Sequence, residues 1–445
     1  MKNVMLSTLI FLFVVTSASG QDSQRLKTIT IDSEILEEER TIKVYLPDHY
    51  SEESDYPVIY ITDGSSSNFG VASNFIDALS DPTYNIIPPS ILVGIVHNNR
   101  NRDLNVFEEQ SGIKFREHLF NEAVSYIDSN YSTSGFNAMI GHSNGAEYNQ
   151  HLLIAENNPF RGFISMSTNF NTDVRDRLTE FFKTYEDKNL YYFIANGSMD
   201  EPSRTMAGND FEALVEKTTN RDFIFNKKTY EANHQNIVPL SMMDGLRHIF
   251  KDYANLDLYP DIYSYVDNYK ADAREIYGLD VHYSFMDLQS YIMDILMNKR
   301  IDEYEYLVEF ITRHNLAPHM GWLDPVNRAN QYFFMEAYPE TIDSYKKGLN
   351  NIESVEARVF VANIWKAIQA YEAENRQEDI MPFLLKSREV LSDDHMLGLN
   401  YYIAKFSLEN NVSEEIGKQA LQYCKDHYSE NRIFSMEDLI ALEKE

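Results

Sequence analysis

The feature that most constrains this chain is a short turn, Gly-His-Ser-Asn-Gly, at residues 141–145. An apolar run at residues 136–140 precedes it, and a run with helical spacing follows at residues 146–154. A strand that meets a helix across so tight a turn leaves almost no room for side chains at the flanking positions, which explains the glycines. Such a turn holds the hydroxyl of Ser143 clear of the sheet edge. Three fixed positions match by chance in many proteins, so the interpretation depends on this context and on residues elsewhere in the chain.

The first twenty residues have the pattern of a secretory signal peptide. Lys2 supplies a positive charge, residues 4–15 are mostly apolar, and Ala-Ser-Gly at residues 18–20 is a small-x-small cleavage pattern. The sequence therefore predicts export, to the periplasm or out of the cell, with cleavage after Gly20. No later run approaches about 18–20 apolar residues, so we expect no membrane span.

Cysteine usage and charge exclude several other classes. The chain has a single cysteine, Cys424, which predicts a buried helix residue and no internal disulfide. Export without disulfides fits a periplasmic or secreted bacterial protein. The formal charge is −30, from 69 acidic and 39 basic residues, so nucleic acid and anionic lipid are poor partners. The 30 tyrosines and 26 phenylalanines indicate real cores in both halves.

Strand-like and helix-like runs alternate from about residue 25 to 255. Strands are expected at residues 26–36, 41–46, 56–62, 91–96, 136–140, 163–166, 190–194 and 223–230, and helices at 115–127, 146–154, 172–185, 207–218 and 239–254. The first two strands alternate in polarity and suit an antiparallel pair at a sheet edge. Alternation of this length predicts an α/β fold with a mostly parallel sheet covered by helices on both faces.

The strand signal stops after about residue 259. Amphipathic runs follow at residues 304–311, 355–371, 397–406 and 416–423, and residues 435–438 form a capping-box pattern before a last helix. We therefore expect a signal peptide at residues 1–20, a sheet domain at 21–258 and a helical domain at 259–445. Two interpretations of the helical domain stay open: a tetratricopeptide-like array of helix pairs, or a nonrepeating helical cap.

The residues after two later strands supply partners for Ser143. A serine hydroxyl becomes a nucleophile when a base takes its proton and an acid orients that base. Asp200 follows the strand at residues 190–194 and is the first candidate acid, with Glu201 as the alternative. His234 follows the strand at residues 223–230 and is the candidate base. Serine, then acid, then histidine is the chain order of α/β-hydrolases, which is the fold that we predict.

Other histidines and metal chemistry fit less well. His142 lies inside the turn itself, and His97 follows a strand before Ser143, whereas His151 and His248 fall within helices. The 12 histidines show no His-Glu-x-x-His spacing, so we expect no metal site.

A tetrahedral intermediate at Ser143 would need two hydrogen-bond donors for its oxyanion. One candidate is the backbone N–H of Asn144, directly after the nucleophile. The second is expected from the loop after the strand at residues 56–62, from the N–H of Ser65 or of Gly64. Asp63 precedes them, and we interpret it as a turn-stabilising residue.

These motifs resemble the putative esterase family, which groups esterase D-like enzymes with enterochelin esterases. Five segments over about residues 25–255 carry the resemblance: 60–64 (Tyr-Ile-Thr-Asp-Gly), 100–104 (Arg-Asn-Arg-Asp-Leu), 115–133, 141–145, and 234–250, which begins His-Gln-Asn-Ile-Val-Pro and ends Gly-Leu-Arg-His-Ile-Phe. The last segment independently selects His234. The resemblance implies carboxylic-ester hydrolysis through an acyl-serine, without a metal or organic cofactor.

The chain departs from the family pattern at three places. Ala146 replaces a glycine, Asn105-Val106 replaces Thr-Pro, and Met-Ser-Thr-Asn at residues 166–169 stands where the family has Pro-Ser. These departures motivate an alternative hypothesis, a catalytically degenerate domain that binds a partner protein through the helical domain. Hydrolysis of peptides or thioesters by the same residues is a third. Among esters, the negative charge favours neutral small-molecule or carbohydrate-linked substrates, and the helical domain is expected either to roof the site or to dock a partner.

Overall fold

The computed structural model describes residues 25–106, 110–170, 172–185, 189–218, 222–318, 321–350 and 354–444. The chain forms two compact units, Met1–His282 and Tyr283–Glu445, and each is described here by itself. The predicted signal peptide at residues 1–20 lies outside the described residues.

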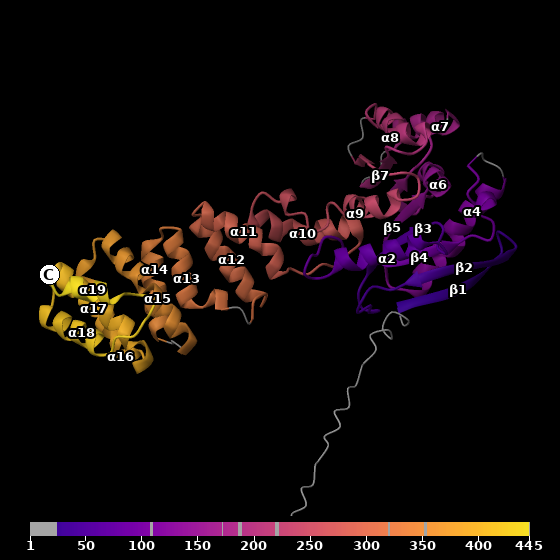
Figure 1. Ribbon diagram of the computed structural model, residues 1–445. Helices are drawn as coiled ribbons and strands as arrows, with labels where there is room; N and C mark the ends of the chain where they lie inside the picture. The colour runs from indigo at the N-terminus through magenta and orange to yellow at the C-terminus, as the bar shows by residue number, and fades with distance from the viewer. Residues whose placement is uncertain are drawn as a thin grey trace, which may run out of the picture. The chain divides into compact units, whose positions relative to one another are not determined.

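The first unit is built on an eight-stranded sheet with the order β1-β2-β4-β3-β5-β6-β7-β8. The strands are β1 (Leu26–Ser33), β2 (Glu38–Tyr45), β3 (Tyr56–Ile61), β4 (Ile91–Val96), β5 (Thr133–His142), β6 (Phe160–Met166), β7 (Leu190–Gly197) and β8 (Phe223–Tyr230). β1 pairs antiparallel with β2, and β2 with β4, while β4, β3 and β5 to β8 are parallel. The two antiparallel strands lie at one edge, as expected (Figure 1). The predicted α/β-hydrolase fold is confirmed.

Helices cover both faces of this sheet. They are α2 (Ser67–Ser80), α3 (Arg100–Asp103), α4 (Gln110–His118), the π-helix η2 (Leu119–Val124), α5 (Ser125–Asn130), α6 (Asn144–Leu153), α7 (Thr172–Thr184), α8 (Pro202–Val215), α9 (Ile237–Ile249), η3 (Leu256–Leu258) and α10 (Ile262–Tyr277). Met139 on β5 joins one core cluster with Tyr148 and Leu152 of α6. On the opposite face, Ile164 of β6 packs so closely on α9 that a Cβ at Gly245 would lie 2.6 Å from it. Strand residues are buried on both faces because parallel strands are covered on both sides.

Helix α10 packs on the sheet of the first unit. The ring of Tyr277 is fully buried and lies 4.9 Å from the ring of Phe136 on β5 and 5.6 Å from that of Phe250. Its hydroxyl donates to the carbonyl of Ile249 at 3.3 Å. The units therefore divide after His282, whereas we expected the boundary at 258/259. Helical periodicity shows that α10 has an apolar face, but it does not show which core that face completes.

The second unit is helical throughout the residues that the structure describes. Its helices are α11 (Phe285–Met297), α12 (Ile301–Arg313), η4 (Gly321–Leu323), α13 (Pro325–Phe334), α14 (Tyr338–Asn350), α15 (Ser354–Ala373), η5 (Gln377–Asp379), α16 (Ile380–Val390), η6 (Asp393–His395), α17 (Met396–Asn410), α18 (Glu414–Asp426) and α19 (Met436–Leu442). Successive helices pack on one another, including α11 on α12, α13 on α14 and α17 on α18. This packing suits helix pairs, and a tetratricopeptide-like repeat stays a prediction.

Two local expectations for this unit are confirmed. The capping box forms at α19, where Ser435 Oγ accepts from the N–H of Asp438 at 3.2 Å and Asp438 Oδ2 accepts from the N–H of Ser435 at 2.7 Å. Cys424 is buried, and burial raises the pKa of its thiol to about 12. Over the described ranges, no helix is both long and apolar enough to cross a membrane.

Candidate active site

The predicted turn forms between β5 and α6, with Ser143 at its apex. The backbone of Ser143 has φ 59° and ψ −123°, a conformation that non-glycine residues rarely adopt. A Cβ at Gly141 would lie 2.3 Å from the carbonyl oxygen of Gly145, and one at Gly145 would lie 2.3 Å from Thr62 Oγ1. Both glycines are therefore required by close approach, as the sequence predicts. Backbone strain of this kind costs about 1–3 kcal/mol and persists where the surroundings impose it.

His234 lies in the loop between β8 and α9, next to this turn. Its Nε2 is 3.0 Å from Ser143 Oγ. Two asparagines fix the loop: Asn233 Oδ1 accepts from the N–H of Asn236 at 3.1 Å, and Asn236 Oδ1 accepts from the N–H of Asn233 at 2.7 Å. The imidazole is thus held within hydrogen-bond reach of the serine hydroxyl, which is the geometry that a general base needs.

His142 supports the same loop from the end of β5. Its Nε2 lies 2.7 Å from the carbonyl oxygen of His234, and the two rings are 4.8 Å apart. Burial lowers the pKa of His142, so the ring is neutral near neutral pH and its Nε2–H donates to that carbonyl. His142 therefore orients the backbone of His234 without competing for the proton of Ser143.

Asp200 follows β7 and faces the other nitrogen of the imidazole. Its Oδ2 is 3.3 Å from His234 Nδ1, and its side chain is 2% exposed. Burial raises the pKa of Asp200, but hydrogen bonds from Ser167, the N–H of Glu201 and His234 outweigh it and lower the pKa below the ordinary value. The side chain of Glu201 is 77% exposed and lies 3.9 Å from Arg204. The geometry favours Asp200 over Glu201 as the acid.

Ser167, which the sequence reasoning missed, lies between the acid and the histidine. Its Oγ is 2.7 Å from His234 Nδ1 and donates to Asp200 Oδ2. The residue is fully buried directly after β6, within the 166–169 segment that departs from the family pattern. The only feature of the sequence that could have indicated Ser167 is its place directly after a predicted strand, because residues at the carboxyl ends of parallel strands gather at one sheet edge.

The oxyanion donors come from α6 and from the loop after β3. Asn144 begins α6, so its N–H has no helical acceptor and points out of the positive end of the helix. The N–H of Gly64 donates to the carbonyl of Ile95 on β4 at 2.8 Å and is thus already bonded. Within the described residues, the N–H of Ser65 has no acceptor. Of the two expected candidates, Ser65 is the one whose donor is available.

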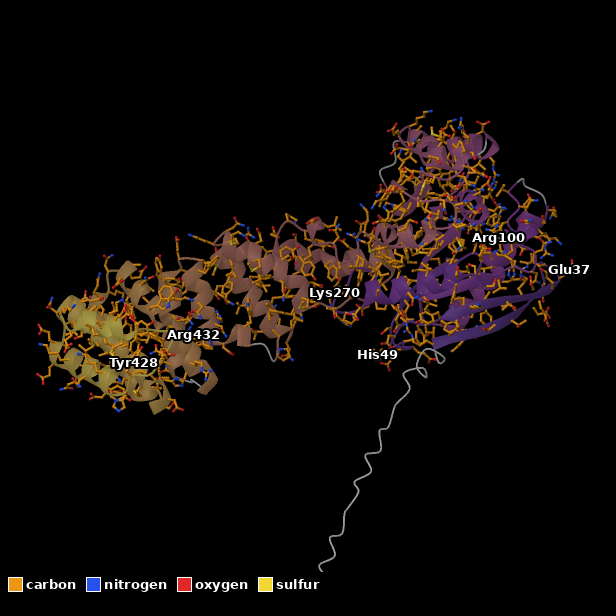
Figure 2. The ribbon with its side chains drawn as sticks, viewed as in Figure 1. Glu37, His49, Arg100, Lys270, Tyr428 and Arg432 are labelled. Atoms are coloured by element: carbon orange, nitrogen blue, oxygen red, sulfur yellow. The ribbon has the colours of Figure 1, made fainter. Side chains whose placement is uncertain are left out.

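Arg100, at the start of α3 and labelled in Figure 2, ties that loop to the turn through the contacts that follow. Its Nε and one terminal nitrogen donate to the two carboxylate oxygens of Asp63, at 2.5 Å and 2.9 Å. The same terminal nitrogen is 3.1 Å from the carbonyl oxygen of His142. Asp63 itself has φ 61°. The guanidinium therefore holds the loop after β3 in a fixed position beside the turn after β5. Two parallel hydrogen bonds to one carboxylate fix the orientation of this contact and also strengthen it.

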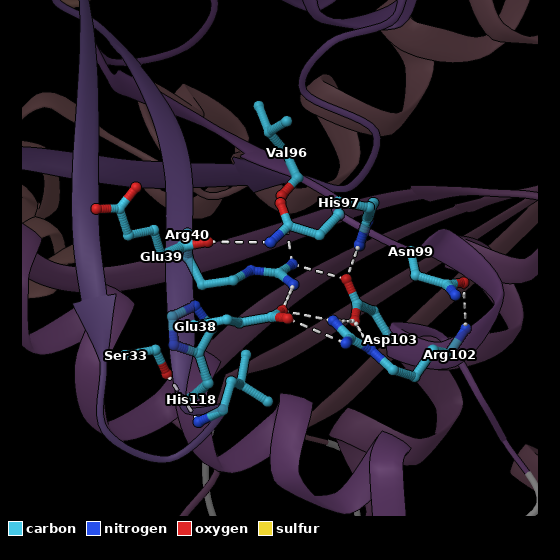
Figure 3. A network of polar contacts seen from close by, with 12 residues as sticks. Ser33, Glu38, Glu39, Arg40, Val96, His97, Asn99, Arg102, Asp103 and His118 are labelled. Carbon is cyan, nitrogen blue, oxygen red and sulfur yellow. Dashed lines mark hydrogen bonds and ion pairs between the residues drawn. The ribbon is translucent and has the colours of Figure 1, made fainter.

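A buried ionic network anchors the other end of α3 (Figure 3). Asp103 Oδ2 lies 2.6 Å from a terminal nitrogen of Arg40 and 3.0 Å from His97 Nδ1. The side chains of Arg40 and Asp103 are each 1% exposed. Burial raises the pKa of Asp103, but hydrogen bonds from His97, Arg40 and Arg102 prevail and bring it to about 2. His97, directly after β4, therefore helps to hold Asp103 at the end of α3, and it lies outside the candidate site.

Replacing Asp103 by asparagine is expected to destabilise the first unit by about 3 kcal/mol at pH 7, because the buried guanidinium of Arg40 loses its buried carboxylate and keeps only the more exposed Glu38. The wild type should show the matching acid sensitivity. A pKa of about 2 against an ordinary value of 3.8 means that the carboxylate's contribution is complete above about pH 4 and is lost as the pH falls through 2. That contribution is on the order of 2 kcal/mol.

The measurement is urea unfolding at pH 7 and at a series of pH values between 5 and 2. Circular dichroism follows both units, whereas tryptophan fluorescence follows the second alone, since Trp322 and Trp365 are the only tryptophans. Asp55→Asn, at an exposed site, is the matched control. Equal midpoints for Asp103→Asn and Asp55→Asn would contradict the prediction.

The described residues contain no cluster of three or more histidine, cysteine or acidic side chains that could hold a metal ion. What the structure brings together is a hydroxyl, an imidazole and a carboxylate, with the N–H of Asn144 directly after the hydroxyl-bearing residue. That arrangement is suited to acyl transfer.

Residues 33–236 match the model of the family described as Putative esterase. Among solved structures, an IroE-like serine hydrolase from Shewanella oneidensis is 23% identical, with a TM-score of 0.52 over 68% of this chain and 99% of that chain. An uncharacterised protein from Capnocytophaga ochracea is 15% identical, with a TM-score of 0.57 over 78% of this chain and 99% of that chain. At these identities both likenesses show the fold. A comparison with curated proteins finds no match.

Proposed function

We propose that this chain is an ester hydrolase that works through an acyl-enzyme formed on Ser143, because residues 33–236 match the Putative esterase model. His234 is the general base and Asp200 is the acid that orients it. The observation that carries the proposal is the 3.0 Å contact between His234 Nε2 and Ser143 Oγ at a strained strand-to-helix turn. The alternative of a degenerate binding module has less support, since all three positions are filled and in contact.

The proposed reaction has two halves. Ser143 Oγ attacks the ester carbonyl carbon while His234 Nε2 takes the hydroxyl proton, and the oxyanion accepts from the N–H groups of Asn144 and Ser65. As the intermediate collapses, the ester C–O bond breaks and Nε2–H protonates the leaving alcohol. Water then attacks the acyl-serine with His234 again as base, which releases the carboxylic acid and restores Ser143.

The substrate class and the setting of the reaction extend this proposal. The net charge of −30 disfavours anionic substrates, which supports neutral small-molecule or carbohydrate-linked esters. The signal-peptide pattern at residues 1–20 supports an exported, periplasmic or secreted enzyme. The second unit, a separate stack of helices, is the proposed surface for a protein partner.

A fluorophosphonate should label the folded protein once, and mass spectrometry of the peptides should place the adduct on Ser143. Protein unfolded in urea before exposure is the control and should not react, because activation of Ser143 depends on His234. A panel of p-nitrophenyl and acetyl-sugar esters then identifies the acyl and alcohol preferences. An adduct on Ser167 or the absence of any adduct would overturn the assignment of the nucleophile.

A further inference from the structure

The nearest hydrogen-bond acceptor to the imidazole of His234 is a hydroxyl and not the carboxylate. Ser167 Oγ lies 2.7 Å from His234 Nδ1, whereas Asp200 Oδ2 lies 3.3 Å from the same nitrogen. The hydroxyl of Ser167 also contacts Asp200 Oδ2. An N–H···O bond is strongest near 2.9 Å and weakens at longer separations, so the direct bond to Asp200 is the weaker of the two.

The number of available protons decides which atom donates in the contact between Ser167 Oγ and His234 Nδ1. A hydroxyl carries one proton, and Asp200 is ionised, so the hydroxyl of Ser167 donates to the carboxylate. Its lone pair is then left to accept Nδ1–H from His234. The opposite direction would place the proton of Ser167 on the Nδ1 side and the ring proton on Nε2. The imidazole could then not accept the proton of Ser143.

We propose that Ser167 is a positioning residue that connects the imidazole of His234 to the carboxylate of Asp200. This inference rests on the proposed function. The hydroxyl holds the ring in the tautomer with hydrogen on Nδ1 and stabilises the imidazolium that forms when Ser143 loses its proton. No covalent bond to Ser167 forms or breaks, and its own proton stays on Oγ.

The surroundings of Ser167 hold that hydroxyl in place. The residue is fully buried and has φ 56°. Its N–H donates to the carbonyl of Ala195 on β7 at 2.9 Å, and its carbonyl accepts from the guanidinium of Arg204 at 2.5 Å. Both backbone groups are therefore bonded, and the side chain is directed by a backbone that is fixed on each side.

Asp200 is also held at its distance. Its Oδ1 accepts from the N–H of Glu201 at 2.8 Å, so the carboxylate cannot turn toward His234 without losing that bond. The direct separation of 3.3 Å should therefore remain when the hydroxyl of Ser167 is removed. The titratable groups in contact with His234 among the described residues are Asp200, after β7, and His142, at the end of β5.

The test compares Ser167→Ala and Ser167→Gly with the wild type. Both variants lack the hydroxyl, but glycine accepts the positive φ without strain, so a shared defect belongs to the hydroxyl. We expect kcat for an activated ester to fall by about 10–100-fold in both, with KM nearly unchanged, from loss of a hydrogen bond to a charged ring. Ser165→Ala is the matched control: this buried hydroxyl contacts Tyr192, Asn149 and the carbonyl of Ala146 and makes no described contact with His234, so its loss should lower stability and spare kcat.

A second readout separates positioning from packing. In the ¹H–¹⁵N spectrum of the imidazole, the wild type should carry the ring proton of His234 on Nδ1, with a far-downfield signal. That signal should move upfield in both Ser167 variants, because Nδ1–H loses its closest acceptor. A folded Ser167→Gly protein with unchanged kcat and an unchanged Nδ1–H signal would overturn the inference. If the wild type itself fails to react at Ser143 with a fluorophosphonate, the proposed function fails instead, and the imidazole spectrum still decides the role of Ser167.

Discussion

Ser143→Ala should reduce kcat for carboxylic esters by roughly 10⁴–10⁶-fold and leave KM within a few-fold of the wild-type value. The hydroxyl is the atom that forms the acyl-enzyme, and no other described hydroxyl is in contact with His234 Nε2. The turn, the N–H groups of Asn144 and Ser65, and the substrate-binding surface all remain. The measurement is steady-state hydrolysis of p-nitrophenyl acetate by each purified protein, with titration of active sites by the fluorophosphonate.

Two further variants test this prediction. Ser198→Ala removes an exposed hydroxyl from the loop that carries Asp200 and should retain wild-type kcat. Ser143→Gly should be as inactive as Ser143→Ala but more stable by about 1–3 kcal/mol, since glycine relieves the strained φ of 59°. Turnover by Ser143→Ala equal to that of the wild type would contradict the mechanism and favour the binding-module alternative.

Asp200→Asn should lower kcat by about 10⁴-fold, although the shape of the side chain is retained. The carboxylate only accepts hydrogen bonds, whereas an amide also donates them. An asparagine NH₂ group facing Ser167 would reverse the hydroxyl so that it donates to His234 Nδ1. The ring proton would then sit on Nε2, which can no longer take the proton of Ser143.

Glu201→Gln is the matched control for this prediction. It makes the same chemical change at the adjacent residue, whose side chain is 77% exposed and lies beside Arg204. We expect its kcat and KM to equal those of the wild type. A large loss in Glu201→Gln together with a small loss in Asp200→Asn would assign the acid to Glu201, the alternative that the sequence left open.

Much of the candidate site follows from signals that are local in the sequence. The two glycines around Ser143 are required by the tightness of one turn, and this requirement can be predicted from the adjacent residues alone. The strand before Asp200 is a short apolar run, the strand before His234 begins with three apolar residues, and both lead into polar loops. Parallel strands place those loops at the same sheet edge, so their order along the chain was sufficient to predict that the three side chains meet. The capping box at Ser435 is another such local signal.

Four outcomes required the tertiary structure, and they share a physical cause. The insertion of Ser167 between His234 and Asp200, and the burial of Asp200 but not Glu201, depend on tenths of an ångström between loops of different strands. The occupied N–H of Gly64 depends on the register of β3 against β4. The placement of α10 on the sheet depends on which apolar surface Tyr277 meets. Turn sterics and periodicity act between neighbours in the chain, so the sequence alone determined the helices and strands, the turn at residues 141–145, and the order in which Asp200 and His234 follow Ser143. Hydrogen-bond partners and the choice of core arise only when separate segments pack together.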